Sequence, residues 1–532
     1  MSDHDKTPRN PSARTWTRLG LGALSGLLAG GAALAVAELA AAAVRPRSGP
    51  VVAVGGAAVD RTPAAVKDWA IRTFGTNDKL VLQLGILAVL TLFALALGAF
   101  AVRHRRAGAA GVLVFGVVGA AAALGRPDSA GVTDAFPSVL GAIAGAVLLY
   151  LLVGLLPAPR REAPGERGEG WDRRRFVIAA TAVAAASAGA GVLGRALSGA
   201  SGREAVASRE NITLPPPDSG APALPRRARA RVEGVSPFTT TNSDFYRVDT
   251  ALVVPKVDAT AWRLRIHGEG VTREKTLTFD DLLRRELIER DITLTCVSNE
   301  VGGPYVGNAR WIGVRLADLL EECGVRPPSA GGPADQLVAR SVDGMTIGSP
   351  VEDVMDGRDA MLAVGMNGEP LPFDHGFPVR MVVPGLYGYV SACKWIEDIE
   401  LTTFDSYDAY WVKRGWAREA PIKTQSRIDT PKPFARPKAG TVMVAGVAWA
   451  QHRGIDKVEI RVDDGPWEEA VLAAEDSRDT WRQWSYAWRA TKGGHTLTVR
   501  ATDRTGEVQT DRRTRTVPDG ASGRHSVVVT VD

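Results

Sequence analysis

Five apolar stretches, each about twenty residues long, lie within the first 200 residues, and they constrain the fold more than any other feature of the sequence. A helix of about twenty apolar residues spans the hydrocarbon core of a lipid bilayer. The predicted spans are residues 19–44, 80–102, 107–124, 139–156 and 176–197. The sequence therefore predicts an N-terminal all-α transmembrane bundle over residues 1–197, embedded in a lipid bilayer.

Positive charge is distributed unevenly among the segments that connect these spans. It gathers in the N-terminal tail, between the second and third spans, and between the fourth and fifth. The basic residues concerned are Lys6, Arg9, Arg14, Arg18, Arg103, Arg105, Arg106, Arg160, Arg161, Arg167, Arg173, Arg174 and Arg175. Because Lys and Arg accumulate in cytoplasmic loops, we expect the N-terminus inside, and the large C-terminal half outside, a bacterial cell membrane.

A run of three arginines directly precedes the fifth predicted span. Asp172-Arg173-Arg174-Arg175-Phe176-Val177 resembles a twin-arginine export signal, and a weakly hydrophobic, Ala-rich stretch follows it. An ordinary basic anchor before a helix is the alternative interpretation. Both predict the same topology, but only the export signal explains the position of Phe176. The twin-arginine route carries proteins that are already folded.

Charge and cysteine content exclude several classes of protein. The formal net charge is +5, but much of the Arg excess borders the apolar stretches and no recognised nucleic-acid module accompanies it, so we expect no nucleic-acid partner. The three cysteines Cys296, Cys323 and Cys393 are too few for a disulfide framework. Before the C-terminal half the only histidines are His4 and His104, which argues against a haem between the spans.

The C-terminal half has a different composition and is predicted to fold into two further domains. Residues 198–237 are rich in Pro, Ala and Arg and read as a linker. Strands and helices then alternate in an α+β domain over residues 238–425. Its predicted elements are strands 261–267 and 292–295 and helices 278–289 and 314–323. Residues 436–532 alternate at strand period between turn signals and predict an all-β, immunoglobulin-like sandwich.

Two stretches of the α+β domain carry chemistry. Cys296 stands at the end of a predicted strand and opens a polar, Gly-containing loop, where a thiolate can reach a bound metal; a plain buried cysteine is the alternative. The second stretch, 366–395, places His375, Arg380, Ser391 and Lys394 around a Gly-containing loop. Backbone N–H groups and fixed cations in such a loop suit a phosphate.

Taken together, these stretches resemble the molybdopterin-binding domain of the sulfite oxidase family over about residues 241–416. The run 367–395 is the specific part of the match, because it extends over many consecutive positions. The sandwich that follows, with residues 446–449 and 458–463, is similar to the accessory domain of that family, which is usually linked with dimerisation. The resemblance implies an enzyme, a molybdenum-dependent oxidoreductase with the molybdenum–molybdopterin cofactor (Moco), and a possible homodimer.

The resemblance also implies roles for individual residues. Cys296 matches the family cysteine whose sulfur binds molybdenum, and it is the expected metal ligand and catalytic residue; a soft thiolate suits that metal. The positions that match pterin and phosphate contacts of the family are Phe245, Tyr246, Arg247, Asp343, His375, Arg380, Ser391 and Lys394. Cys323 and Cys393 are expected to serve packing.

The implied reaction is oxygen-atom transfer at molybdenum with a small oxo-acceptor or oxo-donor. Sulfite-oxidising members usually have an arginine where Glu300 stands, and a family tyrosine near the substrate falls at Trp416. Both departures make a neutral sulfoxide as suitable a substrate as sulfite. Because the sequence has no Cys-x-x-Cys-His motif and no iron–sulfur cysteine set, electrons are expected to pass to an external partner, a cytochrome or a quinone.

Two other functions compete with this interpretation. A non-enzymatic membrane scaffold or receptor could keep the fold without the chemistry, although it would have no use for a thiolate beside a phosphate pocket. A transporter would need intramembrane charges along a path, and only Glu38, near the end of one span, qualifies.

Overall fold

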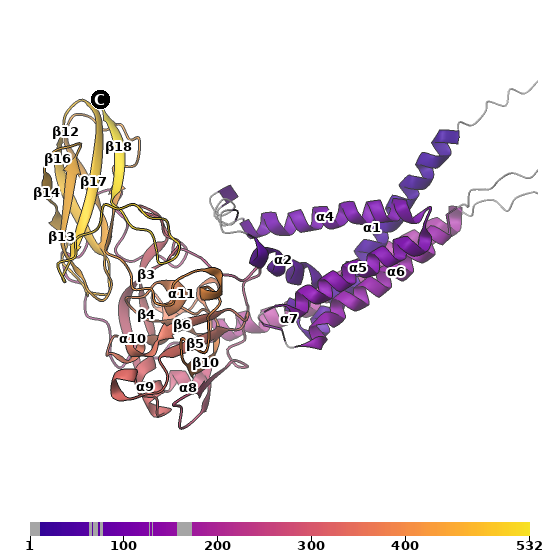
Figure 1. Ribbon diagram of the computed structural model, residues 1–532, viewed down its shortest axis with the longest axis horizontal. Coiled ribbons are helices and arrows are strands. Elements are labelled where there is room, and N and C mark those ends of the chain that lie inside the picture. The colour runs from indigo at the N-terminus through magenta and orange to yellow at the C-terminus, as the bar shows by residue number, and fades with distance from the viewer. Residues whose placement is uncertain are drawn as a thin grey trace, which may run out of the picture. The chain divides into compact units, whose positions relative to one another are not determined.

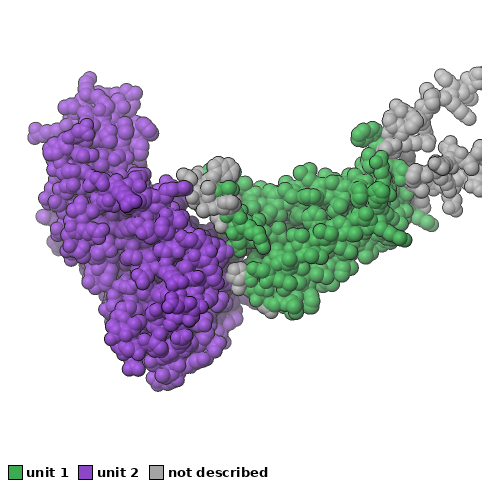
Figure 2. Space-filling view, viewed as in Figure 1, with its two compact units in different colours: residues 1–203, 251–253 green, residues 204–250, 254–532 purple. Residues whose placement is uncertain are grey.

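The computed structural model describes residues 11–62, 66, 73–74, 78–126, 128–129, 131–156 and 173–532. Of the basic and acidic residues named above, Lys6, Arg9, Arg160, Arg161, Arg167 and Asp172 lie outside these ranges, as does His4. The chain forms two compact units, shown in Figures 1 and 2. The helical unit comprises residues 1–203 and 251–253, and the β-rich unit comprises residues 204–250 and 254–532.

The helical unit contains the five predicted spans. Its long helices are α1 (Pro11–Val44), α4 (Asp78–Ala101), α5 (Arg105–Leu124), α6 (Phe136–Gly154) and α7 (Arg173–Glu210), the last of which continues into the β-rich unit. Their membrane-length apolar segments are Trp16–Val44, Leu80–Ala101, Arg105–Leu124, Val132–Gly154 and Arg174–Gly194. Five apolar helices of membrane-spanning length are thus confirmed. The short elements η1 (Pro46–Ser48), α2 (Pro50–Arg61) and η3 (Val132–Ala135), in the connections, were not predicted.

Small residues let the helices of this unit pack backbone to backbone. A Cβ added at Gly98 of α4 would lie 2.2 Å from the carbonyl oxygen of Gly22 in α1, and one at Gly116 of α5 would lie 2.3 Å from Ala142 Cβ in α6. Large apolar side chains point outward instead, as at Leu92, which is 66% exposed. Close contact through small residues with Leu and Val outside is the pattern of helices that pack within lipid.

The first part of the β-rich unit is the α+β domain, built on two sheets. One has the order β2-β1-β10-β5-β6, in which only β1 and β10 are parallel. Its strands are β1 (Arg263–Gly268), β2 (Lys275–Thr278), β5 (Gln336–Ser341), β6 (Thr346–Pro350) and β10 (Ile396–Thr402). The other has the order β3-β4-β7-β8, with β9 paired to β7. Its strands are β3 (Leu287–Thr295), β4 (Val306–Arg315), β7 (Met361–Met366), β8 (Glu369–Pro370) and β9 (Arg380–Val382).

Short helices connect these strands: α8 (Phe279–Leu283), α9 (Leu316–Glu322), η4 (Pro328–Ala330), α10 (Val351–Met355), η5 (Phe373–His375), α11 (Gly388–Ser391) and η6 (Val412–Arg414). One hydrophobic core, with Trp311 and Phe377 fully buried in it, joins both sheets. The predicted α+β class is confirmed.

Two antiparallel sheets form the C-terminal part of the same unit (Figure 1). The first is β11 (Gln425–Thr430), β12 (Gly440–Trp449), β16 (Arg482–Ala490) and β15 (Val471–Leu472), in that order. The second is β14 (Trp467–Glu469), β13 (Ile455–Val462), β17 (Gly493–Asp503) and β18 (His525–Val531). Val458, Ile460, Leu497 and Val499 alternate into the core between them, as the strand period predicted. The all-β class is confirmed.

Two predicted helices were wrong in extent. The helix predicted over 278–289 is a single turn, Phe279–Leu283, whose N-terminus is closed by the capping box of Thr278 and Asp281, and Leu287 already belongs to β3. The helix predicted over 314–323 begins only at Leu316, because Val314 and Arg315 pair with β7. Both errors come from apolar residues whose burial in a sheet overrides their local helical spacing.

Candidate cofactor site

Cys296 lies directly after β3, in a turn that the chain closes with its own backbone. The Cys296 N–H donates to the Tyr305 carbonyl at 3.0 Å, and the Cys296 carbonyl accepts from Asn299 N at 3.0 Å. Asn299 Oδ1 in turn accepts from Tyr305 N at 2.8 Å. The residue is 8% exposed. Burial raises the pKa of the Cys296 thiol, while hydrogen bonds from Ser298 and the charge of Lys394 oppose this rise. A metal cation at the sulfur would reverse the balance toward the thiolate.

Aromatic rings line the region next to this turn. Phe245 stacks on Tyr246 at 5.1 Å between ring centroids and meets the rings of Trp311 and His375 edge-on at 5.9 and 5.6 Å. A Cβ at Gly307 of β4 would lie only 2.9 Å from the Phe245 ring, so glycine is needed there. Burial, together with the nearby Cys296, raises the pKa of Tyr246, while Arg380 opposes it. The Tyr246 phenol therefore stays protonated and can donate a hydrogen bond.

His375 ends the short helix η5, and Arg380 is the first residue of β9. His375 Nε2 lies 2.8 Å from the Asn242 carbonyl, so this nitrogen carries the proton and Nδ1 is left as an acceptor. Burial lowers the pKa of His375 to about 4, and the charges of Arg380 and Lys394 act in the same direction. The ring is therefore neutral at pH 7.

Arg380 is a buried cation with little to bind within the described part of the chain. It is 6% exposed, and burial lowers its pKa to about 10. Its Nη1 donates to the His375 carbonyl at 3.3 Å, its guanidinium stands 5.1 Å from the centre of the Trp311 ring, and its Nε finds no acceptor among the described residues. Unpaired charge in an interior is costly, so this position suits a bound anion.

Lys394 and Arg247 share one carboxylate. Lys394 Nζ lies 3.1 Å from Asp249 Oδ2 and 3.1 Å from the Asp374 carbonyl oxygen, and Arg247 Nε lies 3.2 Å from the same Asp249 Oδ2. A Cβ at Gly376 would lie 3.1 Å from Lys394 Cα and 3.0 Å from Arg380 Cβ, so the two cations flank one glycine.

The other two candidates have mainly local partners. Asp343 accepts from Thr250 Oγ1 at 3.1 Å and from Met345 N at 3.3 Å, which closes the turn between β5 and β6. Ser391 is fully buried, and its hydroxyl donates to the carbonyls of Leu386 and Tyr387 at 2.9 and 3.1 Å. Ser391 thus holds the loop before α11. The structure brings Tyr246, Cys296, His375, Arg380 and Lys394 together, whereas Asp343 and Ser391 shape the surrounding turns.

This donor set fits the cofactor that the sequence implies. A phosphate ester requires cations that are shielded from water, which Arg380 and Lys394 offer. A soft metal requires a thiolate, which Cys296 offers. In the residues that the structure describes, no three His, Cys, Asp or Glu side chains come together. Cys296 would therefore be a lone protein ligand to a metal that carries its other ligands with it.

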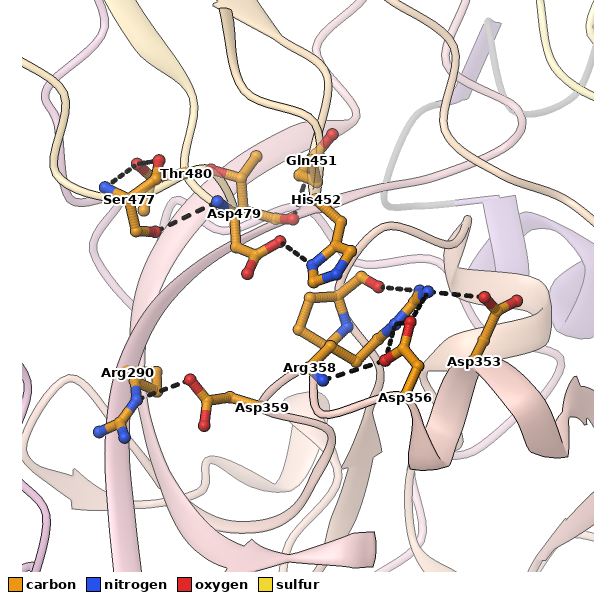
Figure 3. A network of polar contacts seen from close by, with 12 residues as sticks. Arg290, Asp353, Asp356, Arg358, Asp359, Gln451, His452, Ser477, Asp479 and Thr480 are labelled. Atoms are coloured by element: carbon orange, nitrogen blue, oxygen red, sulfur yellow. Dashed lines mark hydrogen bonds and ion pairs between the residues drawn. The ribbon is translucent and has the colours of Figure 1, made fainter. Parts of the chain in front are cut away.

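Sequence analysis missed the residues of the sandwich that contact this site. Gln451 donates to Thr293 and Thr295, just before Cys296, and Arg427 Nη1 donates to the Gly303 carbonyl at 2.8 Å, just after it. Figure 3 shows a polar network nearby, in which Arg358 binds Asp353, Asp356 and the Pro384 carbonyl while His452 binds Asp479 at 3.2 Å. Gln451, His452 and Arg427 come from the sandwich, whereas Arg358 and its carboxylate partners come from the α+β domain, and no local sequence pattern marks any of them.

Known proteins are similar to this part of the chain. Residues 251–411 match the family model described as the oxidoreductase molybdopterin binding domain. Mitochondrial sulfite oxidase of Mus musculus is 31% identical over 291 residues, which cover 47% of this chain and 52% of that protein. The uncharacterized oxidoreductase YuiH of Bacillus subtilis (strain 168) is 31% identical over 182 residues, 34% of this chain and 85% of that protein.

A crystal structure of the sulfane dehydrogenase SoxCD from Paracoccus pantotrophus has a TM-score of 0.48 and 25% identity, over 56% of this chain and 84% of that chain. The chain spans about half the length of the mitochondrial sulfite oxidases that it matches. The B. subtilis oxidoreductase, by contrast, is covered over most of its length. With that coverage, the matching domain model and the fit of the site to a molybdopterin, the chain belongs to the sulfite oxidase family of molybdopterin-binding oxidoreductases.

Proposed function

We propose that this protein is a membrane-anchored molybdenum oxidoreductase that transfers an oxygen atom to or from a small substrate outside the cytoplasm. Arg380 carries the proposal. It is a buried guanidinium whose only hydrogen bond within the described chain is 3.3 Å long, and it faces Tyr246 beside Cys296. A chain gains nothing from such a cation unless an anionic group binds there.

The side chains divide the work of holding the cofactor. Cys296 would hold molybdenum through its sulfur, and Arg380 and Lys394 would neutralise the phosphate. His375 offers Nδ1 as a hydrogen-bond acceptor, because its Nε2 proton is committed to Asn242. Phe245, Tyr246 and Arg247 form the wall on the pterin side, and Asp343 and Ser391 hold the turns that support it. When bound, the cofactor supplies two-electron oxygen-atom transfer at molybdenum.

The substrate is proposed to be a neutral oxo-donor or oxo-acceptor such as a sulfoxide. Glu300 is exposed in the Cys296 turn, where its carboxylate repels an anion that approaches the site. Sulfite oxidation is the second candidate, and the similarity to mitochondrial sulfite oxidases favours it.

The helical unit supports the rest of the proposal. Its five spans anchor the chain in the bilayer, and Arg103, Arg105 and Arg106 follow α4 at the membrane side that we assign to the cytoplasm. When the five spans are counted from the cytoplasmic side, the β-rich unit lies outside the cytoplasm. Electrons exchanged with the substrate pass to an external cytochrome or to a membrane quinone. The sandwich offers a surface for a homodimer, as the accessory domains of the family do.

Metal and pterin analysis tests the proposal. The full chain is made in a host that synthesises the cofactor, and molybdenum content and pterin fluorescence are measured for the wild type, Cys296→Ser and Cys323→Ser. Cys323 is the matched control, a fully buried thiol at the end of α9. We expect stoichiometric molybdenum in the wild type and in Cys323→Ser, and altered metal spectra with lost activity in Cys296→Ser. A wild type without molybdenum would overturn the proposal and favour the scaffold.

A further inference from the structure

We infer that Gln451, contributed by the sandwich, is a positioning residue for the Cys296 sulfur. The inference rests on the proposed function, in which that sulfur binds molybdenum. Gln451 follows β12, is 1% exposed, and stands about 150 positions from the cysteine that it serves.

One amide group of Gln451 makes two hydrogen bonds to the end of β3. Its Nε2 donates to the Thr293 carbonyl at 3.0 Å and to Thr295 Oγ1 at 3.0 Å. Thr295 is the last residue of β3 and directly precedes Cys296. Both contacts are buried, so neither is weakened by competition with water.

These bonds complete the free edge of a sheet. β3 is the outermost strand of its sheet: β4 pairs along one side, and on the other side Ser219 forms an isolated bridge to Ile288, at the end away from Cys296. On its other side Thr293 N donates to the Asp479 carbonyl at 2.9 Å, and Trp481 N donates to Thr293 Oγ1 at 2.7 Å. Asp479 and Trp481 both belong to the sandwich, which lies against this edge (Figure 1). The sandwich therefore replaces the missing neighbour strand at the end of β3 that carries Cys296.

The turn after Cys296 is held from the sandwich as well. Gly302 has a φ of +79°, and a Cβ there would lie 2.3 Å from the ring of His525. Arg427 Nη1 donates to the next carbonyl, that of Gly303, at 2.8 Å. Cys296 thus lies between two anchored points, one at residues 293–295 and one at 302–303.

Gln451 can be compared with a second buried glutamine of the same sandwich. Gln483 is 2% exposed; its Nε2 donates to the Ser236 carbonyl at 2.6 Å and its Oε1 accepts from Ala230 N at 2.6 Å. Both glutamines make two hydrogen bonds to segments outside the sandwich. Only the hydrogen bonds of Gln451 reach β3, the strand directly before Cys296. Substituting each glutamine in turn therefore separates an effect on the position of the sulfur from an effect on the stability of the protein.

The experiment compares Gln451→Met with Gln483→Met in the full chain. Alkylation of Cys296 by iodoacetamide is followed by mass spectrometry in protein made without cofactor, with the fully buried Cys323 and Cys393 as internal references. Because alkylation requires local opening around a buried thiol, we expect Gln451→Met to react about tenfold faster than wild type and Gln483→Met within about twofold of it. In cofactor-loaded protein, we expect only Gln451→Met to change the paramagnetic resonance spectrum of one-electron-reduced molybdenum.

Equal acceleration in the two variants, or an unchanged rate in Gln451→Met, would overturn the inference. Thr295→Val serves if Gln451→Met does not fold, because it removes the hydroxyl that accepts from Gln451 and keeps the side-chain shape. The proposed function fails separately: a wild type without molybdenum would refute it, while the alkylation rates would still decide whether Gln451 holds Cys296.

Discussion

At the scale of single residues, Arg380 and Arg358 both carry buried guanidinium groups, but they differ in the hydrogen-bond partners that surround them. Arg358 binds Asp353 and Asp356 at 2.6 and 2.7 Å, whereas Arg380 has one long hydrogen bond to a carbonyl. We expect Arg380→Met to lower molybdenum content at least about tenfold and to leave cofactor-free protein as stable as wild type or more so, because it removes a buried charge and only one long hydrogen bond, to the His375 carbonyl. Elemental analysis and thermal unfolding measure the two effects.

Arg358→Met is the control for this prediction. It leaves two carboxylates without their cation, and we expect it to destabilise cofactor-free protein by about 3 kcal/mol. An Arg380→Met protein that unfolds as early as Arg358→Met and still retains molybdenum would contradict the role of Arg380 in anion binding.

His525 links stability to pH. Burial lowers its pKa to about 4, with the charge of Arg427 acting in the same direction, and its Nδ1 accepts from Ile428 N at 3.0 Å. Between pH 6.5 and 4 the unfolded chain therefore binds more protons at this residue than the folded chain, so stability falls as pH falls, by up to about 3 kcal/mol. We expect His525→Asn, whose carbonyl oxygen can still accept, to flatten this loss in thermal unfolding of the full chain from pH 7.5 to 4.5.

The control for His525 is a histidine with the opposite shift. A hydrogen bond to Asp463 raises the pKa of His495, so its contribution is present at low pH and is lost as pH rises through the folded-state pKa. His495→Asn should therefore steepen the loss at low pH. His375, whose pKa is also lowered to about 4, adds a loss of the same sign as His525 that remains in both variants. Identical pH profiles for His525→Asn and wild type would refute the assignment.

The residues that could be predicted from sequence are those that stand in continuous motifs. His375 and Arg380 occur five positions apart in one run, and the structure places them side by side. Gln451 and His525 could not be predicted, because their contacts to the Cys296 turn join positions more than 150 apart and depend on how the sandwich docks. Gln and His at strand ends are common, and nothing in their neighbours distinguishes these two.

At the scale of elements, the packing of α1 against α4 depends on glycine at one crossing. A Cβ at Gly98 would lie 2.2 Å from Gly22 O and 2.7 Å from Gly26 Cα, whereas one at Gly85 of the same helix has nothing within 4 Å. We expect Gly98→Leu to separate the two helices and to destabilise the full chain by about 2 kcal/mol or more. We expect Gly85→Leu to be neutral. Thermal unfolding in detergent compares them, and equal behaviour of the two variants would refute this packing.

Helices and strands could be predicted from the sequence where a single environment determines which of their side chains are buried. The five membrane-length segments are apolar over most of their length, and sandwich strands such as β18 alternate between exposed and buried residues, so local pattern and final burial agree. The segment 278–289 was mispredicted because Leu287 and Ile288 fit a helical stripe but are buried by pairing with β4, which a local pattern cannot show. α2 escaped prediction because its twelve residues are too short for a span.

At the scale of the whole molecule, the predicted linker 198–237 is more than a spacer. α7 continues through Glu210, Arg209 Nε donates to the Leu371 carbonyl at 2.8 Å, and Ala228 is 1% exposed. As domain boundaries, 1–197, 198–237, 238–425 and 436–532 stay predictions. The contacts nevertheless tie parts of this segment to residues far along the chain, as does the hydrogen bond from Ala474 N to the Arg227 carbonyl at 2.9 Å, although its Pro and Ala content is typical of flexible linkers.

The last prediction concerns how the β-rich unit reaches its side of the membrane. We expect it to be exported already folded, through the twin-arginine-like sequence that begins α7, because that route carries folded proteins and so allows the cofactor to be bound in the cytoplasm. Replacing Arg173 and Arg174 together by Lys keeps the charge that anchors a helix but removes the guanidinium pair of the signal. Protease added to spheroplasts should then no longer cleave the β-rich unit, which it cleaves in the wild type.

Arg105 and Arg106, at the start of α5, provide the matched control, since they are a basic pair bordering a span at the same proposed membrane side. Their replacement by Lys should leave the β-rich unit accessible to protease, because positive charge alone orients that helix. If the Arg173 and Arg174 double variant is cleaved as readily as this control, the basic run is an ordinary anchor. The β-rich unit would then cross the membrane by a route that does not depend on the guanidinium pair, and the prediction of export in the folded state would be refuted.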